Sequence, residues 1–336
     1  MKTNWFKNAR PESLPQSVMP AVVAVVLATS ATDFCWWSAV LAVIGVALAH
    51  LSANLADDYF DYKADMLQDR EKVVRQGIKA FTAKYPYLTN GSATEKQLRN
   101  AVIGYGLGAV LCGVIVCMFR GWAIMMVAAV AGVLAFFYSA PPIKLCYHGL
   151  GELVTGLIFG PLLMLGVFWA SAGEIWWGIL GVSVPMGLLV TNILFTHSMI
   201  DKAGDTASEK KTLAAVCPKM NMTISWLLIF VPFLIITFFA WYEQRWLYLI
   251  VYLMLPRAIW LYWSLIQFQK GADFEKELEK PRKILGPMGD WKQYRELGLD
   301  WFLIRWLTAR NIVSGYCGLV IVAKLVEKLI ELIFHI

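Results

Sequence analysis

WWSAVLAVIGVALAHLSANLADDYFDYKAD, residues 36–65, joins a long apolar run to a dense cluster of carboxylates. Within nine residues the cluster contains Asp57, Asp58, Asp61 and Asp65. If the apolar run continues as a helix, Asn54 and all of these aspartates except Asp57 lie within roughly 60° of one another, at about 100° per residue. Like charges on one helix face repel each other. The cluster therefore predicts a bound cation beside a membrane, most simply Mg²⁺, which prefers oxygen ligands.

The composition of the chain indicates a membrane protein. Of its 336 residues, 58% are hydrophobic and only 16% are charged, whereas an average soluble domain carries about 25% charged residues. The mean hydropathy of +0.57 agrees with this interpretation. Apolar runs recur from end to end and leave no segment the size of a soluble domain. We therefore predict an all-α, polytopic membrane helical bundle.

Nine apolar runs are close to the length of about 20 residues that a membrane-spanning helix needs. They are residues 15–31, 35–57, 98–118, 121–140, 151–171, 175–200, 222–241, 246–267 and 312–335. We expect one transmembrane domain over residues 15–336, preceded by a short cytoplasmic segment, residues 1–14. An odd number of spans places the two termini on opposite sides of the membrane.

The basic residues predict the orientation of the chain. Most of the 30 Lys and Arg residues lie in the N-terminal segment and in the loops after the second, fourth, sixth and eighth runs. Because cytoplasmic loops are enriched in Lys and Arg, we expect the N-terminus and these loops in the cytoplasm, and the chain in a bacterial inner membrane. Basic residues spread over separate loops argue against nucleic-acid binding.

Two further loops on the predicted cytoplasmic side carry polar motifs. Residues 138–152, YSAPPIKLCYHGLGE, contain a proline pair that cannot continue the preceding helix, and Lys144, which can reach a phosphate group. Residues 201–213, DKAGDTASEKKTL, place Asp201 and Asp205 four residues apart, on one helical face.

Two carboxylate clusters with lysines on one side of a membrane suit a diphosphate ligand. Mg²⁺ ions would bridge the carboxylates to the phosphate groups, and basic side chains would neutralise the remaining charge of a departing pyrophosphate. Two charged residues in apolar runs leave alternatives open. Glu152 is either functional or a partner of its helix N-terminus, and Arg257 is either functional or structurally paired.

With these motifs the chain resembles the UbiA superfamily of intramembrane aromatic prenyltransferases, over roughly residues 15–335. Residues 57–65 are similar to its N-D-x-x-D-x-x-x-D motif. Residues 201–213 are similar to its second aspartate motif, D-x-x-x-D followed by G-K-x-T-L. Residues 138–152 are similar to the Y-x-x-P-P…G-L-G-E segment that is typical of the menaquinone branch, the dihydroxynaphthoate polyprenyltransferases.

The resemblance implies a helical bundle with a central cavity open to the lipid bilayer. In it a polyprenyl diphosphate is held through Mg²⁺ at the two motifs, and a small aromatic acceptor attacks the allylic carbocation. The residues implied in catalysis and metal binding are Asp58, Asp61, Asp65, Asp201 and Asp205. The residues implied in substrate binding are Asn54, Asp57, Arg75, Tyr138, Lys144 and Lys210.

Several positions depart from the family pattern. Asp57 stands where Asn is usual, Cys146 and His148 stand in place of a Lys and an Arg, and Ile200 and Glu209 replace an Arg and a Gly. None of these departures removes a core aspartate, so Mg²⁺-diphosphate chemistry remains the leading hypothesis.

The preferred function is transfer of a polyprenyl group to dihydroxynaphthoate in menaquinone-type biosynthesis. Three alternatives remain at this point. One is a UbiA-type transferase with a phenolic, lipid or sugar-phosphate acceptor, and a second is a non-catalytic isoprenoid-binding homologue, which the departures motivate. The third is a transporter whose carboxylates bind cations, although transporters place such residues near the bilayer midplane and both clusters here lie near the predicted cytoplasmic ends.

Overall fold

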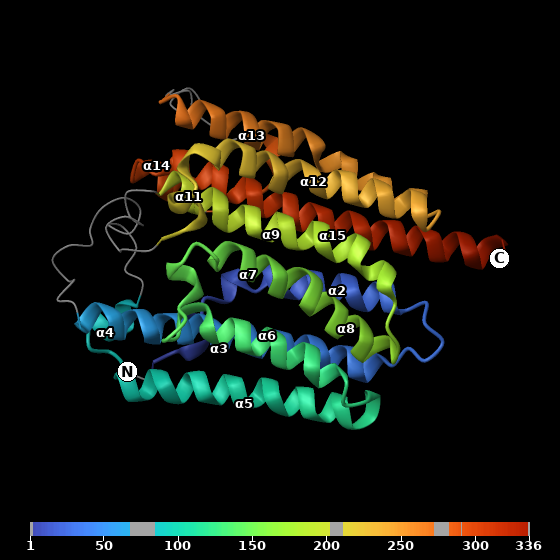
Figure 1. The fold of residues 1–336 in the computed structure, drawn as a ribbon, viewed down its shortest axis with the longest axis horizontal. Helices are drawn as coiled ribbons and strands as arrows, with labels where there is room; N and C mark the ends of the chain where they lie inside the picture. The colour runs from blue at the N-terminus through green and yellow to red at the C-terminus, as the bar shows by residue number, and fades with distance from the viewer. Residues whose placement is uncertain (1–2, 68–84, 202–210, 272–281, 290, 335–336) are drawn as a thin grey trace.

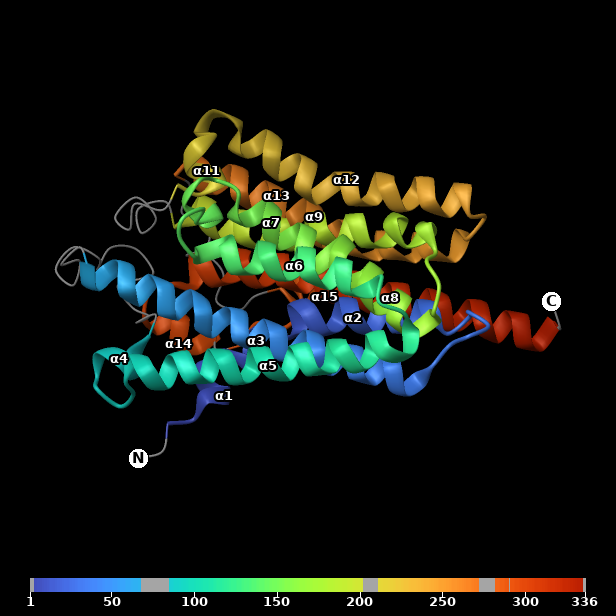
Figure 2. The same cartoon turned by 60° about the horizontal axis from the view of Figure 1, so that its bottom comes forward.

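The computed structural model describes residues 3–67, 85–201, 211–271, 282–289 and 291–334, with side chains beyond Lys63 in the first range left out. Within these ranges every regular element is helical and no strand is present, which confirms the predicted all-α class. Figures 1 and 2 show long helices packed roughly side by side in one bundle.

The described helices occupy all nine apolar runs. The longer ones are α2 (Pro15–Ala28), α3 (Trp36–Leu67), α5 (Glu95–Arg120), α6 (Ile124–Ser139), α7 (Gly151–Leu157), α8 (Leu163–Ala172), α9 (Leu180–Ile200), α12 (Asn221–Tyr242), α13 (Leu255–Gln269) and α15 (Asp300–Phe334). Short helices flank them, namely α1 (Trp5–Asn8), α4 (Pro86–Thr89), α11 (Leu213–Val216) and α14 (Trp291–Glu296). Short 3₁₀ segments include η1 (Pro11–Ser13), η4 (Leu145–Tyr147) and η8 (Trp246–Met254), and a π-helical turn, η5 (Ile158–Leu162), joins α7 to α8.

The expected count of nine membrane spans is not confirmed. Six helical stretches of the described chain are long and apolar enough to cross a membrane: Trp36–Lys63, Glu95–Arg120, Gly151–Ala172, Trp177–Ile200, Pro218–Tyr242 and Trp246–Gln269. Helices α2 and α6 are apolar but shorter. The remaining predicted span lies in α15, which includes the charged side chains Lys324, Glu327, Lys328 and Glu331.

Local sequence signals set several helix ends. Thr94 and Gln97 form a capping box at the start of α5, in which each side chain binds the other residue's backbone N–H. Helix α6 ends at Ser139, and Ala140 is already extended before the Pro141–Pro142 pair, because a residue that precedes proline avoids the helical region. The break that the proline pair predicts is therefore confirmed.

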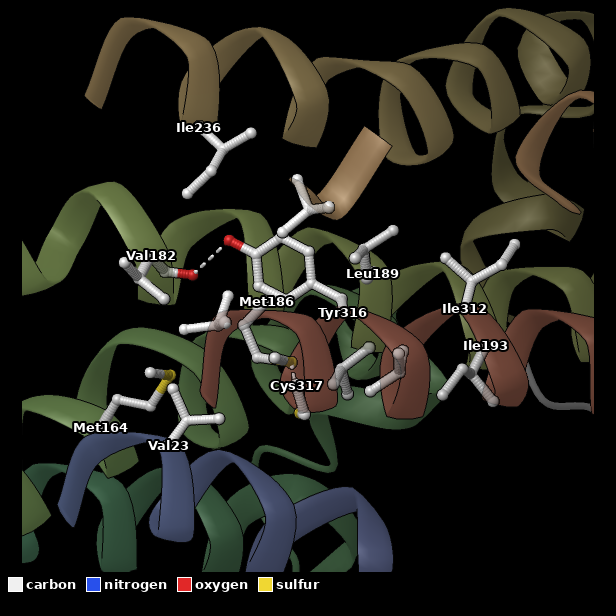
Figure 3. Packing of buried hydrophobic residues seen from close by; sticks show 14 of the residues in the cluster. Val23, Met164, Val182, Met186, Leu189, Ile193, Ile236, Ile312, Tyr316 and Cys317 are labelled. Carbon is white, nitrogen blue, oxygen red and sulfur yellow. Dashed lines mark hydrogen bonds between the residues drawn. The ribbon is translucent and has the colours of Figure 1, made fainter. Parts of the chain in front are cut away.

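The core is centred on α9, which packs between α15, α12 and the α7–α8 region. In Figure 3, Met186 and Leu189 of α9 face Tyr316 and Cys317 of α15, and the Tyr316 hydroxyl donates a hydrogen bond to the Val182 carbonyl at 3.2 Å. In a membrane such contacts stabilise the bundle through close packing more than through the hydrophobic effect.

Glycines allow α7 to cross α9 at very short range. A Cβ atom added at Gly156 would lie 2.0 Å from the Thr191 hydroxyl oxygen and 2.5 Å from the Gly187 carbonyl oxygen. Only residues without a side chain let two helix backbones approach this closely. The crossing holds the first turn of α7 beside the C-terminal half of α9, where the polar motifs meet.

Candidate active site

A large cavity of about 1790 Å³ runs between α3, α5, α6, α7, α8 and α9. Most of its wall is apolar. Its polar end is lined by Asp57 and Asp61 of α3, Asp201 at the end of α9, and Tyr138 and Ser139 of α6. Two aspartate motifs that are about 140 residues apart in sequence thus contribute carboxylates to one cavity.

The face that α3 turns to the cavity is centred on Asp57 and Asp61. Both side chains line the cavity and are four residues apart, hence about 40° apart around the helix. Asp57 accepts a hydrogen bond from the Ser139 hydroxyl at 2.5 Å. Asp61, only 5% exposed, accepts one from the Tyr147 hydroxyl at 3.0 Å. Helix α6 and the loop after it therefore fix the rotamers of both carboxylates.

Asp58 points to a different side of α3. It is 1% exposed and is not among the residues that line the cavity. Its Oδ1 atom accepts a hydrogen bond from Arg10 Nη2 at 3.2 Å, and its Oδ2 atom accepts one from the Tyr87 hydroxyl at 2.8 Å. The sequence-based assignment of Asp58 as a metal ligand stays a prediction, and in the structure Asp58 binds the N-terminal segment and α4.

Charge and burial keep both partners of Asp58 in their hydrogen-donating forms. Burial and the neighbouring Asp58 carboxylate raise the pKa of the Tyr87 hydroxyl. Burial alone would lower the pKa of Arg10, but the nearby carboxylates of Asp58 and Asp57 raise it. Arg10 Nη2 also lies 3.8 Å from Asp57 Oδ2, so one guanidinium offsets part of the charge of two adjacent aspartates.

Asn54 anchors the segment that carries Arg10. Its side-chain nitrogen donates to the Ala9 carbonyl and to the Ser13 hydroxyl, both at 2.9 Å. Its backbone carbonyl accepts from Arg10 Nη2 at 2.8 Å. Ala9 is fully buried in this contact. Although Asn54 lines the cavity, its amide group is occupied in holding residues 9–13 against α3.

Asp201 and Glu152 belong to the opposite wall of the cavity. Asp201 caps α9 and is 2% exposed. Glu152, 4% exposed at the start of α7, accepts hydrogen bonds from the Ser198 hydroxyl and from the Leu213 backbone N–H, each at 3.0 Å. One buried carboxylate thus connects α7, α9 and the end of the loop after α9.

Tyr138 near the end of α6 and Lys144 in the loop after α6 are placed differently. Tyr138 lines the cavity. Lys144 adopts a left-handed backbone conformation with φ of 47°, and its Nζ atom lies 5.5 Å from the centre of the Tyr147 ring. Lys144 is not part of the cavity wall, but it contacts the tyrosine that donates to Asp61. Gly149, with φ of +76°, allows the close approach of Val216.

Four predicted site residues cannot be placed. Arg75, Asp205 and Lys210 lie outside the described residues, as does the departure Glu209. Asp65 lies in the last turn of α3, where the described structure does not include side chains.

Several residues of the polar end were missed by sequence reasoning. Arg10 and Tyr87 bind Asp58, while His50 and His197 line the cavity. His50 lies one helical turn before Asn54 on α3, and His197 lies one turn before Asp201 on α9. Their spacing of four residues from predicted site residues was the available signal. For Arg10 the sequence offered no comparable signal.

The donor set at the polar end fits a hard divalent cation. Among the described residues no three carboxylate, histidine or cysteine side chains are close enough to form a complete metal site. However, Asp57, Asp61 and Asp201 present carboxylate oxygens to the same cavity from two walls. Such an arrangement suits a cation that is shared with an anionic ligand, because Mg²⁺ is usually held by one or two carboxylates together with substrate phosphates.

Comparisons with known proteins agree with the fold and with the motifs. The sequence pattern of the UbiA prenyltransferase family matches residues 17–278. A 1,4-dihydroxy-2-naphthoate octaprenyltransferase of Mycobacterium tuberculosis is 29% identical over 62% of this chain and 68% of its own length. A 2-carboxy-1,4-naphthoquinone phytyltransferase of a Synechocystis strain is 26% identical over 62% of this chain and 64% of its own length.

Solved structures resemble the chain in fold. A UbiA homolog from Archaeoglobus fulgidus bound to GPP and Mg²⁺ superposes with a TM-score of 0.53 at 12% sequence identity, covering 93% of this chain and 100% of the homolog. The family pattern covers most of the sequence, and the apolar helices agree with it. This chain is therefore an integral membrane protein that belongs to the UbiA prenyltransferase family.

Proposed function

We propose that the protein transfers a polyprenyl group from a polyprenyl diphosphate to a small aromatic acceptor, with dihydroxynaphthoate as the preferred acceptor. The observation that carries this proposal is the placement of Asp57, Asp61 and Asp201 at the polar end of one long, otherwise apolar cavity. A diphosphate requires the polar end and an isoprenoid chain requires the apolar remainder. Both relatives described above carry a naphthoate or naphthoquinone acceptor in their names but differ in the prenyl group.

Asp57, Asp61 and Asp201 would hold Mg²⁺ together with the diphosphate. When bound, the metal ions neutralise the charge that develops on the departing diphosphate. In this proposal Asp58 is a positioning residue and not a ligand, because Arg10 and Tyr87 occupy both of its oxygens. The metal role that the sequence assigned to Asp58 passes to Asp57, which is the position where the family pattern has Asn.

The chain's own residues align the reacting groups. Tyr147 and Ser139 keep the carboxylates of α3 turned toward the cavity, and Glu152 keeps the loop after α9 against α7. The carbon–oxygen bond to the diphosphate breaks, and the electron-rich ring forms a carbon–carbon bond to the prenyl group. The ring then regains aromaticity by losing a proton from the attacked carbon to the released diphosphate, or by losing the carboxylate of that carbon as CO₂. The mainly apolar wall of the cavity would keep water away from the allylic cation.

The orientation and the location are part of the same proposal. The aspartates of the polar end lie near the C-terminal ends of α3 and α9, and α1 lies toward the same end of the bundle (Figure 1). We assign this end to the cytoplasmic face of a bacterial inner membrane, in agreement with the distribution of basic residues. The transmembrane domain of residues 15–336 is proposed as one unit, to which residues 9–13 are bound by Asn54.

The test is an assay of the purified protein in lipid nanodiscs with Mg²⁺, polyprenyl diphosphates and several aromatic acids, with the products identified by mass spectrometry. We expect release of diphosphate and a prenylated product, either a naphthoate or, where the carboxylate leaves as CO₂, a dihydroxynaphthalene. The variants Asp61→Ala and Asp201→Ala should lower turnover by about 10²-fold or more, the size of effect seen when one stabilising group is removed. Asp33→Asn, in the loop before α3 at the other end of the bundle, is the matched control and should retain turnover.

The outcomes separate the alternatives. If a product forms with a phenolic or lipid-phosphate acceptor but not with dihydroxynaphthoate, the proposed acceptor is refuted and the proposed transferase activity is kept. Mg²⁺-dependent donor binding without product from any acceptor would favour a non-catalytic isoprenoid-binding protein. Full turnover in Asp61→Ala or Asp201→Ala would contradict the carboxylate–Mg²⁺ mechanism.

A further inference from the structure

Two glycines face the apolar part of the cavity with open space in front of them. Gly113 of α5 and Gly132 of α6 both line the cavity. A Cβ atom added at either position would meet nothing within 4 Å, beyond its own chain neighbours. Larger side chains at these two positions of the cavity wall would therefore have room without displacing the bundle.

The depth of Gly132 can be measured along α6. The Ser139 hydroxyl binds Asp57 at the polar end, and Gly132 precedes Ser139 by seven residues in the same helix. At 1.5 Å of rise per residue, Gly132 lies about 10 Å below the level of the carboxylates.

Gly113 lies deeper, as the packing of α5 against α3 shows. The two helices run antiparallel and side by side (Figures 1 and 2). Ser52 of α3 donates to the Val102 carbonyl of α5 at 2.9 Å, and farther down a Cβ atom at Gly45 would lie 3.1 Å from Cys112 Cβ. Gly45 precedes Asp57 by twelve residues, so Gly113, which adjoins Cys112, lies about 18 Å below the carboxylates.

These depths correspond to positions along a prenyl chain. An extended isoprenoid unit adds four carbon–carbon bonds of roughly 1.5 Å each, and is therefore about 5 Å long. The level of Gly132 then falls near the end of the second unit, and the level of Gly113 falls between the third and the fourth. A donor of two units ends at Gly132, a donor of three units passes Gly132 only, and donors of four or more units pass both glycines.

We propose that Gly132 and Gly113 are specificity-determining residues that keep the cavity open for donors longer than two and longer than about three isoprenoid units, respectively. This inference rests on the proposed function only for the placement of the diphosphate at Asp57, Asp61 and Asp201. A large side chain at Gly132 should exclude shorter donors than a large side chain at Gly113.

The experiment compares Gly132→Phe and Gly113→Phe with the unaltered protein, with one acceptor and donors of one, two, four and more isoprenoid units. We expect Gly132→Phe to lower kcat/KM at least tenfold for donors of four or more units relative to the one-unit donor. Gly113→Phe should lower kcat/KM for donors of four or more units by a similar factor and leave kcat/KM for the two-unit donor unchanged. Gly104→Phe is the matched control, because Gly104 lies on α5, also has open space in front of it, and is not part of the cavity wall.

A second measurement does not depend on turnover. Thermal stabilisation of each variant by Mg²⁺ with each donor diphosphate reports binding directly, and it should show the same order of lengths. Gly132→Leu and Gly113→Leu replace any phenylalanine variant that does not fold. The inference would be overturned if a variant lost kcat/KM equally for donors of every length, or if both variants kept the donor-length preference of the unaltered protein. If the protein has no turnover but binds the donors in the expected order of lengths, the proposed function is refuted and the role of Gly132 and Gly113 in donor length is kept.

Discussion

The pairing of Arg10 with Asp58 leads to a prediction about stability. Arg10→Ala removes two hydrogen bonds, one to Asp58 Oδ1 and one to the Asn54 carbonyl, and leaves a carboxylate that is 1% exposed with Tyr87 as its remaining partner among those described above. Breaking a buried pair costs roughly 3–5 kcal/mol, and breaking an exposed pair about 1 kcal/mol or less. The Arg10 side chain is 36% exposed.

This intermediate exposure sets the expected magnitude. We expect Arg10→Ala to lower the free energy of unfolding by about 2–3 kcal/mol, between the values for buried and surface pairs. Such a loss corresponds to a decrease in Tm of roughly 5 °C or more. Arg10→Lys should lower the free energy of unfolding by less, because lysine keeps the positive charge. Some loss should remain, because lysine lacks the forked donor geometry of arginine.

The assay is thermal unfolding in detergent without Mg²⁺, so that loss of metal binding does not contribute. Arg10→Ala, Asp58→Asn and the double variant form a mutant cycle, for which we expect a coupling energy of about 1–2 kcal/mol. Lys7→Ala, an exposed basic residue of the same segment, is the control and should leave Tm unchanged. Additivity of the two single variants would show that the N-terminal segment does not hold Asp58 as described.

Three further outcomes follow from other contacts. Gly156→Ala should destabilise the bundle by about 1–3 kcal/mol or more in thermal unfolding, since its methyl group would overlap Thr191, whereas Gly104→Ala should be neutral or stabilise by roughly 0.5–1 kcal/mol. Glu152→Gln should keep most of the turnover, while Glu152→Ala should lose it together with about 1–3 kcal/mol of stability, because the half-buried Leu213 N–H would lose its acceptor. Equal turnover and stability of the two variants would contradict this role. Chelation of Mg²⁺ should abolish turnover and leave the helical content in circular dichroism unchanged, and readdition should restore activity.

The sequence predicted the helices more reliably than the direction of side chains around them. Each apolar run became helical, and the end of α6 before Pro141 was correct. The number of spans is not confirmed, because length and hydropathy alone do not separate a span from a helix such as α15, which buries Lys324 inside the bundle. Lys324 is paired with Glu327 on the same helix at 2.7 Å. Glu327 is also bound by Arg245 at 2.7 Å, a contact between distant parts of the chain that no local pattern reveals.

The candidate site shows the same division. Periodicity placed Asn54, Asp58 and Asp61 on one face of α3, and it set Asp57 apart. In the structure, however, the aspartates of α3 that line the cavity are Asp57 and Asp61, and Asp58 does not line it. On the other side Asp58 is bound by Arg10, which approaches it from a segment 48 residues earlier. Such long-range partners are set by the tertiary fold and cannot be derived from helical spacing.

The attachment of the N-terminal segment to α3 has a practical consequence for experiments. Residues 9–13 lie beside the carboxylates of α3, and Arg310 of α15 donates to the Glu12 carbonyl at 2.7 Å. The other end of the described chain, the last turns of α15, extends past the opposite end of the bundle (Figures 1 and 2). An affinity tag or fluorescent fusion placed before α1 therefore adds bulk next to the polar end of the cavity, whereas one placed after α15 is about as far from it as the molecule permits.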